Sequence, residues 1–244
     1  MKKEIEGKKV SAARISDEEP KNKIERLQKF VYENRNLISY ISIGVIVLVV
    51  IGFWLRGYLS EKSQEDANKA MVALTRIYPY YDAPDYRKAL FGDSSVTIRG
   101  ERLIGLLEII DEYSGTDQAY IAAFYAGNSY LALNKADEAI EYFEMSLNSP
   151  SKTVIEGSYA GLGACFELKK DYNEAANYYE KAANLSIDEK TKARYNYYAG
   201  LCYEKIGEVE KAVQIFKDIM FKNRYNEFGN LAKGGLARLG TVIE

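Results

Sequence analysis

The sequence contains no histidine, only two cysteines and only four prolines among its 244 residues. Without histidine, the chain cannot use histidine-based general acid–base chemistry, Ser-His-Asp or Cys-His nucleophiles, or histidine-containing metal sites. Two cysteines are too few for a Cys-rich zinc site or for a fold held by several disulfides. We therefore expect a protein that is not an enzyme and that has no catalytic residues, no metal site and no cofactor.

The chain also lacks an excess of charge of either sign. Lys and Arg together number 33 and Asp and Glu number 35, which gives a formal net charge of -2. This balance gives no reason to expect nucleic acid as a partner. Hydrophobic residues make up 47% of the chain, which is enough to build a core, but they are distributed unevenly along it.

One segment, residues 37–55, holds 19 residues without a charge (LISYISIGVIVLVVIGFWL). As a helix it would be about 28 Å long, close to the roughly 30 Å hydrocarbon core of a bilayer. Tyr40, Trp54 and Tyr58 lie near its ends, where aromatic rings favour the lipid–water boundary. The run is too long for a signal-peptide core, and no small-x-small cleavage site follows it. The segment predicts a retained transmembrane helix, with a buried core helix as the alternative.

The two flanks of this run differ in basic residues. Residues 17–36 carry five Lys or Arg, whereas residues 56–75 carry three. Residues 1–36 hold ten basic and seven acidic residues, net +3, and residues 57–244 hold 22 and 28, net -6. The positive-inside rule then favours a cytoplasmic N-terminus. We expect a single-pass protein of a bacterial inner membrane with its C-terminal domain in the periplasm; the inverted, cytosol-facing topology is the alternative.

The segment before the run, residues 1–36, is predicted to be a mostly disordered cytoplasmic tail, because its first part is highly charged and lacks aromatic residues and apolar periodicity. From Ile24 to Tyr32, apolar residues recur at positions 24, 27, 30 and 31, which is the spacing of one helical face. This spacing predicts a short helix that either lies on the membrane or extends the anchor. A docking segment for a cytosolic partner is a further alternative without a specific signal.

Three segments of the C-terminal part repeat the same pattern. Glycines recur in steps of 36 and 37 residues, and each is followed at fixed offsets by an aromatic residue, an alanine and a second aromatic residue. These positions are Gly127, Tyr130, Ala139 and Phe143; Gly163, Phe166, Ala175 and Tyr179; and Gly200, Tyr203, Ala212 and Phe216. Paired helices can approach where one presents Gly and the other Ala, while the aromatic rings fill the space toward the next pair. The pattern resembles the tetratricopeptide repeat, whose period is about 34 residues.

This resemblance implies a solenoid of helical hairpins. Together with the transmembrane helix predicted from residues 37–55, it gives an all-α fold in which a single N-terminal transmembrane helix precedes the solenoid. Residues 117–244 would hold the repeats and a C-terminal capping helix from Phe228 to Val242. Residues 57–116 would form an imperfect first hairpin, in which helices at 61–78 and 101–113 are joined by a long loop. A loop of that length inside a compact domain is usually functional or mobile.

Short polar or glycine-containing segments separate the paired helices, and such residues end one helix and begin the next. They lie at residues 134–137, 170–172 and 207–209. Cys165 and Cys202 occupy equivalent positions in adjacent repeats. Equivalent helices of neighbouring hairpins lie about 8–10 Å apart, whereas a disulfide needs Cα atoms within about 7 Å. We therefore expect two buried free thiols rather than a disulfide.

The geometry of the tetratricopeptide family implies that the first helix of each hairpin lines a concave groove. The groove residues would be Phe124, Asn128 and Leu131 from the first repeat, Ala164 and Glu167 from the second, and Arg194, Tyr197, Leu201 and Glu204 from the third. A groove with aromatic, amide and charged side chains suits an extended or helical peptide. We expect Tyr197 and Arg194 to be its main exposed anchors; the alternative is a face that is only solvated.

The motif DEYSGT at residues 111–116, after a hydrophobic helix, and the order of anchor and repeats resemble membrane-anchored repeat proteins related to the ancillary SecYEG translocon subunit. This resemblance implies association with the Sec translocon and periplasmic chaperones. The residues themselves support a membrane-anchored scaffold for protein–protein interactions, with the bilayer as the partner of residues 37–55. Two alternatives stay open, a membrane tether for a separate enzyme or receptor and a cytosol-facing adaptor.

Overall fold

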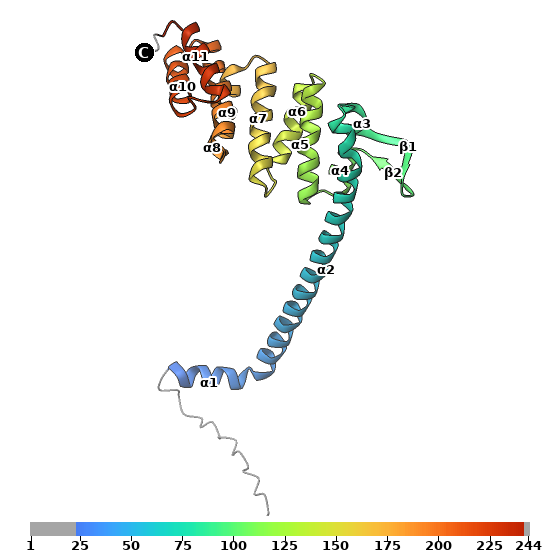
Figure 1. The fold of residues 1–244 in the computed structure, drawn as a ribbon. Coiled ribbons are helices and arrows are strands. Elements are labelled where there is room, and N and C mark those ends of the chain that lie inside the picture. The colour runs from blue at the N-terminus through green and yellow to red at the C-terminus, as the bar shows by residue number, and fades with distance from the viewer. Residues whose placement is uncertain (1–22, 242–244) are drawn as a thin grey trace, which may run out of the picture. The chain divides into compact units, whose positions relative to one another are not determined.

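The computed structural model describes residues 23–241, which divide into two units, one ending at Glu61 and one beginning at Lys62 (Figure 1). The first unit holds helix α1 (Lys23–Glu33) and the beginning of helix α2 (Arg35–Asp82). The second unit begins within α2 and holds all later elements. The tail predicted to be disordered lies mainly in residues 1–22, outside the described part of the chain.

In the first unit, α2 exposes a long apolar surface. An 18-residue window of this helix has a mean hydropathy of 2.5, and 0% of it is buried. Phe53 and Trp54 are 82% and 69% exposed. Among the described residues, α2 is the one helix that is long and apolar enough to cross a membrane. Because none of the window is buried, this run is not a core helix of the described fold.

The second unit contains helical hairpins in series, as the repeat pattern predicts (Figure 1). The hairpins pair α5 (Asp117–Ala132) with α6 (Ala136–Ser146), α7 (Lys152–Leu168) with α8 (Tyr172–Leu185), and α9 (Glu189–Ile206) with α10 (Val209–Lys222). Helix α11 (Glu227–Arg238) packs against both α9 and α10. The capping helix is therefore confirmed, but it ends at Arg238 rather than at Val242, which lies outside the described residues.

The three turns inside the hairpins share one backbone conformation. Asn134, Lys170 and Gly207 have positive φ angles of 59°, 63° and 83°, and each lies in a predicted turn. Asparagine and glycine adopt this left-handed region more readily than other residues, and here it reverses the chain between paired helices. Several helices then begin at a side chain that accepts a hydrogen bond from the N–H group three residues later. These N-caps are Thr116, Asp171, Asp188 and Asn226.

The repeat glycines leave space for aromatic rings. A Cβ atom added at Gly127 would lie 2.8 Å from the ring of Phe143, and one added at Gly161 of the next hairpin would meet the same ring. The fully buried ring of Phe143 therefore packs on its own hairpin and on the next one. The third repeat has the same arrangement, with the ring of Phe216 against Gly200 and Gly235.

All three repeats correct one detail of the predicted packing, as the second repeat illustrates. We expected Gly163 to face Ala175 of the paired helix, with the aromatic ring filling the space toward the next hairpin. Instead, a Cβ atom at Gly163 would lie 2.8 Å from the ring of Tyr179, one helical turn after Ala175. An added methyl group at Gly163 would collide with that ring. The glycine therefore makes room for an aromatic side chain within its own hairpin.

The buried side chains of the second unit form two clusters. The first joins the end of α2 to the elements up to α7, and the second joins α8 to α11. Cys165 belongs to the first cluster and Cys202 to the second, and both are free and buried. Burial raises the pKa of each thiol to about 12. The prediction of two buried free thiols is confirmed.

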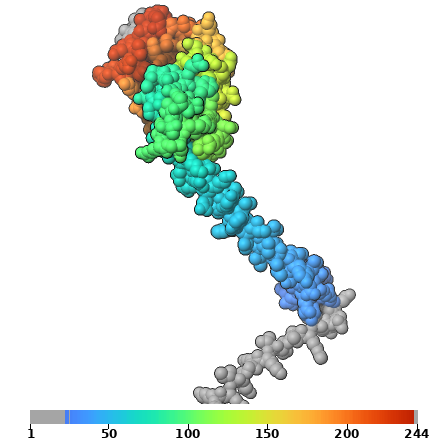
Figure 2. Space-filling model, turned by 90° about the vertical axis from the view of Figure 1, so that its right-hand side faces the viewer, coloured from blue at the N-terminus to red at the C-terminus, as the bar shows by residue number. Residues whose placement is uncertain are grey.

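The segment between the anchor and the first repeat differs from the prediction of a long loop at residues 79–100. It folds into α3 (Tyr86–Phe91), β1 (Gly92–Ile98), β2 (Glu101–Ile104) and α4 (Leu106–Glu112). Figure 2 shows this segment, coloured teal to green, on the face turned toward the viewer. The helix expected at 101–113 therefore begins only after β2, and the fold is mostly but not entirely helical. Helix α2 also continues through Pro79, where we expected it to end.

The two strands form an antiparallel hairpin around a two-residue turn. Ile98 pairs with Glu101, and the intervening Arg99 and Gly100 have φ angles of 54° and 85°. Two consecutive positive φ angles match the twist of paired strands. The side chain of Val96, like that of Ile98, packs against the first buried cluster. This packing fixes the hairpin to the helical part of the unit.

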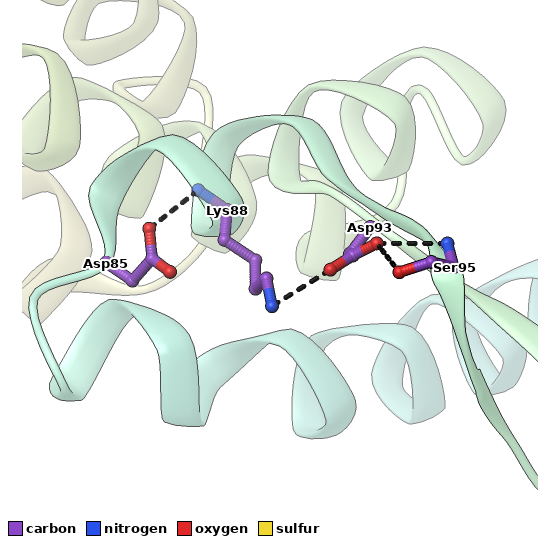
Figure 3. A network of polar contacts seen from close by, with 4 residues as sticks. All are labelled: Asp85, Lys88, Asp93 and Ser95. Atoms are coloured by element: carbon purple, nitrogen blue, oxygen red, sulfur yellow. Dashed lines mark hydrogen bonds and ion pairs between the residues drawn. The ribbon is translucent and has the colours of Figure 1, made fainter.

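A polar network holds the start of the hairpin (Figure 3). The carboxylate of Asp93 accepts hydrogen bonds from the backbone N–H and the hydroxyl of Ser95, at 2.9 and 2.6 Å, and pairs with Lys88 Nζ at 2.9 Å. The Ser95 hydroxyl and the Lys88 ammonium group lower the pKa of Asp93 to about 2. The strand register shifts between Asp93 and Thr97. The network therefore stabilises an irregular strand that no simple alternation of apolar residues would predict.

Candidate functional site

The predicted groove residues lie on α5, α7 and α9, as expected for the first helices of the hairpins. Their exposure differs. Phe124, Asn128, Leu131, Ala164, Arg194, Leu201 and Glu204 are half-buried, Glu167 is exposed and Tyr197 is buried. This face is therefore more engaged in packing than the sequence predicts.

The prediction of an exposed anchor at Tyr197 is wrong. Its side chain is 8% exposed, and its ring centroid lies 5.6 Å from that of Phe216 and 6.3 Å from that of Phe228. Phe228 comes from α11, so the capping helix covers a ring that would otherwise face the groove. Tyr197 serves the contact between repeats and cannot be the main anchor for a peptide.

Arg194, the second expected anchor, is also held by its own helix. Its guanidinium group donates a hydrogen bond of 3.0 Å to the hydroxyl of Tyr195 and lies 4.7 Å from the centre of that ring. Its Nε atom is buried and has no hydrogen-bond partner among the described residues. The side chain is therefore directed along the neighbouring tyrosine rather than into open space.

The remaining polar groove residues also have partners within the chain. Glu204 accepts two hydrogen bonds from Arg238 of α11, at 3.1 and 2.9 Å. Glu167 accepts one of 2.9 Å from the hydroxyl of Tyr179, whose pKa is raised by burial and by this carboxylate. The amide of Asn128 donates to the backbone oxygen of Phe124 at 3.0 Å. These groups already make hydrogen bonds that a bound peptide would have to replace.

What the face offers to a partner is mainly a strip of half-buried apolar surface. Its half-buried apolar residues are Phe124 and Leu131 in α5, Ala164 in α7 and Leu201 in α9. Ala164 lies in the middle repeat and has the smallest side chain of the four. We call these four residues the groove strip. It could hold the apolar side of a peptide, but it offers few directed polar contacts.

A tyrosine cluster next to the first repeat is absent from the sequence prediction. Tyr81 is its centre, with ring centroids 4.7 Å from Tyr125 of α5, 5.9 Å from Tyr78 and 6.2 Å from Tyr86. Burial raises the pKa of Tyr81 to about 12, and the neighbouring phenol groups add to the effect. The ring of Phe124 lies 5.7 Å from that of Tyr125, so the cluster continues the groove strip. Its sequence signal was the dense group of tyrosines in the segment taken for a loop.

A separate cleft of about 560 Å³ lies between α2, β2 and α4. Its walls carry charges of both signs, and most of these are paired. Arg76 pairs with Glu101, and Arg102 pairs with Glu108. Since the cations have carboxylate partners, the cleft does not concentrate charge of one sign. It offers no clear preference for an ionic ligand.

No cluster of three or more His, Cys, Asp or Glu residues that could hold a metal ion occurs among residues 23–241. The expectation that the protein is not an enzyme and needs no cofactor stays a prediction.

The repeat architecture agrees with a comparison with known families. A family model described as Iml2/Tetratricopeptide repeat protein 39 matches residues 57–224, which is more than half of the chain. The chain belongs to the Iml2/tetratricopeptide repeat protein 39 family. No curated protein matches it. Membership in a tetratricopeptide-type family supports a scaffold for protein–protein interactions.

The family match covers the repeats but not the apolar run before them. It begins at Gly57, after the charge-free run at residues 37–55. The match therefore bears on the helical hairpins and not on the anchor. It gives no support to the resemblance to the ancillary SecYEG subunit, which rested on the combination of anchor and repeats.

Proposed function

We propose that this chain is a single-span membrane protein that presents a tetratricopeptide-type scaffold to partner proteins in the periplasm of a bacterium. The observation that carries the proposal is the combination of two features in one chain. The second unit consists of stacked helical hairpins, and the first exposes an apolar helix of which 0% is buried in the most hydrophobic window. The scaffold acts without catalysis of its own.

The apolar helix supports the anchoring part of this proposal. Its charge-free run at residues 37–55 has the length of a bilayer core. Five basic residues in the flank before it, against three in the flank after it, support a cytoplasmic N-terminus and a periplasmic scaffold.

The groove strip and the tyrosine cluster support the binding part. Tyrosine rings such as those of the cluster are among the side chains that contribute most at protein interfaces, and the apolar side chains of the groove strip add surface that excludes water. A partner segment lying along α5, α7 and α9 would cover both features, because Phe124 joins them. Following the resemblance to SecYEG-associated proteins, we propose the Sec translocon or periplasmic chaperones as sources of that segment.

The test places a large charged side chain in the middle of the groove strip. Ala164→Arg should block a peptide there while keeping a good helix former at a half-buried position. Asn184→Arg, at an exposed position of α8, adds the same side chain on another helix. Partners are cross-linked in intact membranes, recovered with the full chain and quantified by mass spectrometry, and circular dichroism confirms equal folding.

We expect Ala164→Arg to lower partner recovery at least several-fold and Asn184→Arg to leave it unchanged. Equal recovery by both variants would contradict binding at the groove strip. In that case a tether function, exerted through another surface, would account for the protein better.

A further inference from the structure

Helix α1 exposes an apolar face that none of the described residues of the first unit covers. Ile24, Leu27, Phe30 and Val31 are 68%, 63%, 59% and 48% exposed. At 100° per residue, these four side chains fall within an arc of about 120° around the helix axis. A narrow apolar face on an otherwise polar helix is typical of helices that lie at a membrane surface.

The position of α1 in the chain places it at such a surface if α2 spans the bilayer. The helix ends at Glu33, and the charge-free run begins at Leu37. The backbone connection is tight, because Asn34 donates from its backbone N–H and its side-chain amide to the Phe30 oxygen, and Ile38 N–H donates to the Asn34 oxygen. At 1.5 Å per residue, Glu33 lies about 6 Å along the chain from the start of the run.

The charges of α1 argue against a place for this helix inside the hydrocarbon core as part of the span. Lys23, Arg26 and Lys29 recur every third residue and would have to enter the hydrocarbon core. With Arg35, the segment 23–35 carries four basic residues against two acidic ones. An excess of basic residues beside an apolar face complements anionic lipid headgroups.

A hollow lies at the corner between α1 and α2. It is open, has a volume of about 430 Å³ and is lined by Leu27, Gln28, Val31, Tyr32 and Arg35. The guanidinium carbon of Arg35 lies 5.6 Å from the centre of the Tyr32 ring. Apolar walls beside an arginine suit a phospholipid, with its acyl chain against the walls and its phosphate group near the cation.

We propose that α1 lies in the headgroup region of the bilayer and binds anionic phospholipids through Arg26, which flanks the apolar face, and Arg35, which lines the hollow. Its apolar face enters the upper acyl region, and the hollow at the α1–α2 corner receives one lipid. This inference rests on the proposed membrane anchor. It adds a second, surface-lying contact and a preference for lipid charge.

The experiment uses the full chain reconstituted into phosphatidylcholine vesicles, with or without phosphatidylglycerol, in which the lipids carry bromine at shallow or deep acyl positions. Trp54 is the single native tryptophan and reports on the span. In a Trp54→Phe background, Phe30→Trp reports on α1. Tyr225→Trp, at a position that is 95% exposed in the second unit, is the matched control reporter.

We expect shallow bromines to quench the tryptophan at position 30 several-fold more strongly than the one at position 225. Equal, weak quenching of both reporters would overturn the surface position of α1. Quenching of native Trp54 distinguishes a failure of the surface position of α1 from a failure of the proposed membrane span in α2. If Trp54 is quenched and the reporter at 30 is not, α1 alone is misassigned; if Trp54 is not quenched either, the anchor itself fails.

A separate variant tests the preference of α1 for anionic phospholipids. Arg26→Gln and Arg35→Gln are combined in the position-30 reporter, and Lys152→Gln and Lys190→Gln, at exposed positions of the second unit, form the control. We expect brominated phosphatidylglycerol to quench several-fold more than brominated phosphatidylcholine in the control, and equally in the first variant. An unchanged preference in the first variant would overturn headgroup binding by these residues.

Discussion

The two units place the same kinds of side chain in opposite surroundings. In the first unit, Val47 and Phe53 are 48% and 82% exposed, whereas in the second Phe143 and Phe216 are fully buried. The repeats bury their aromatic rings against glycines of their own and the next hairpin. Among residues 23–241, the apolar part of α2 has no such neighbours. The difference indicates that the second unit supplies its own apolar environment, whereas the apolar part of α2 has none among the described residues, which is what the proposed span in a bilayer would need.

The largest expected effect concerns the repeats. Phe143→Ala should lower the free energy of unfolding of the second unit by about 3–5 kcal/mol, because it removes a fully buried ring that contacts two hairpins. Thermal unfolding of the full chain in detergent measures this change. Phe221→Ala, at a position that is 62% exposed, is the control. Membrane retention should be the same in both variants, and a loss confined to Phe143→Ala would contradict independent units.

The reciprocal change acts on the first unit. Val47→Arg places a charge at the middle of the predicted span and should make insertion less favourable by about 2.5–3.5 kcal/mol. The fraction of the chain resistant to alkaline extraction from membranes should fall. The unfolding transition of the repeats should stay unchanged. Val47→Leu is the matched control, and equal extraction of both variants would argue against a span centred on this residue.

A smaller effect is expected for the β1–β2 segment of the second unit, which the Asp93 network stabilises and which lacks the regular packing of the repeats. This effect is a dependence of stability on pH. The folded pKa of Asp93, about 2, lies below its ordinary value of 3.8. The ionised carboxylate therefore stabilises the fold above about pH 4, and this contribution is lost as the pH falls from about 4 to 2. Asp93→Asn should reduce the change in melting temperature across that window.

The control for this effect is Asp111→Asn, at an exposed position of α4. It should keep the pH dependence of the unchanged chain. An identical pH dependence in Asp93→Asn would mean that the network around Lys88 and Ser95 does not contribute to stability.

The repeats could be predicted because the residues that pack together lie close in the sequence and recur with a regular period. Gly127, Gly163 and Gly200 recur at nearly constant spacing, and each lies against a ring 16 residues later in the chain. The turns at Asn134 and Gly207 follow from residue types that tolerate a positive φ. The spacing of the glycines and the residue types of the turns can be recognised in the sequence without knowledge of the tertiary structure.

The strand hairpin could not be predicted in this way. Its alternation of apolar residues is short, and the register shift after Asp93 interrupts it. Arg99 adopts a positive φ angle that its residue type does not favour. The sequence therefore shows polar and turn residues where the structure has paired strands.

The prediction of exposed groove residues was wrong for a different reason. Tyr197 has the correct place on the first helix of its repeat, but Phe228, 31 residues later, covers it. Glu204 is likewise engaged by Arg238 of the same capping helix. Positions on a helix face can be predicted from spacing, whereas the contacts that occupy them depend on the next element in the stack.

The topology of the chain tests the central claim, a scaffold displayed outside the cytoplasm by one span. Alkaline phosphatase fused after Glu244 is active only when it is exported, and a cytosolic reporter fused at the same point is active only when it is not. The account predicts an active phosphatase and an inactive cytosolic reporter, with both fusions retained in the membrane. An inactive phosphatase together with an active cytosolic reporter would contradict it.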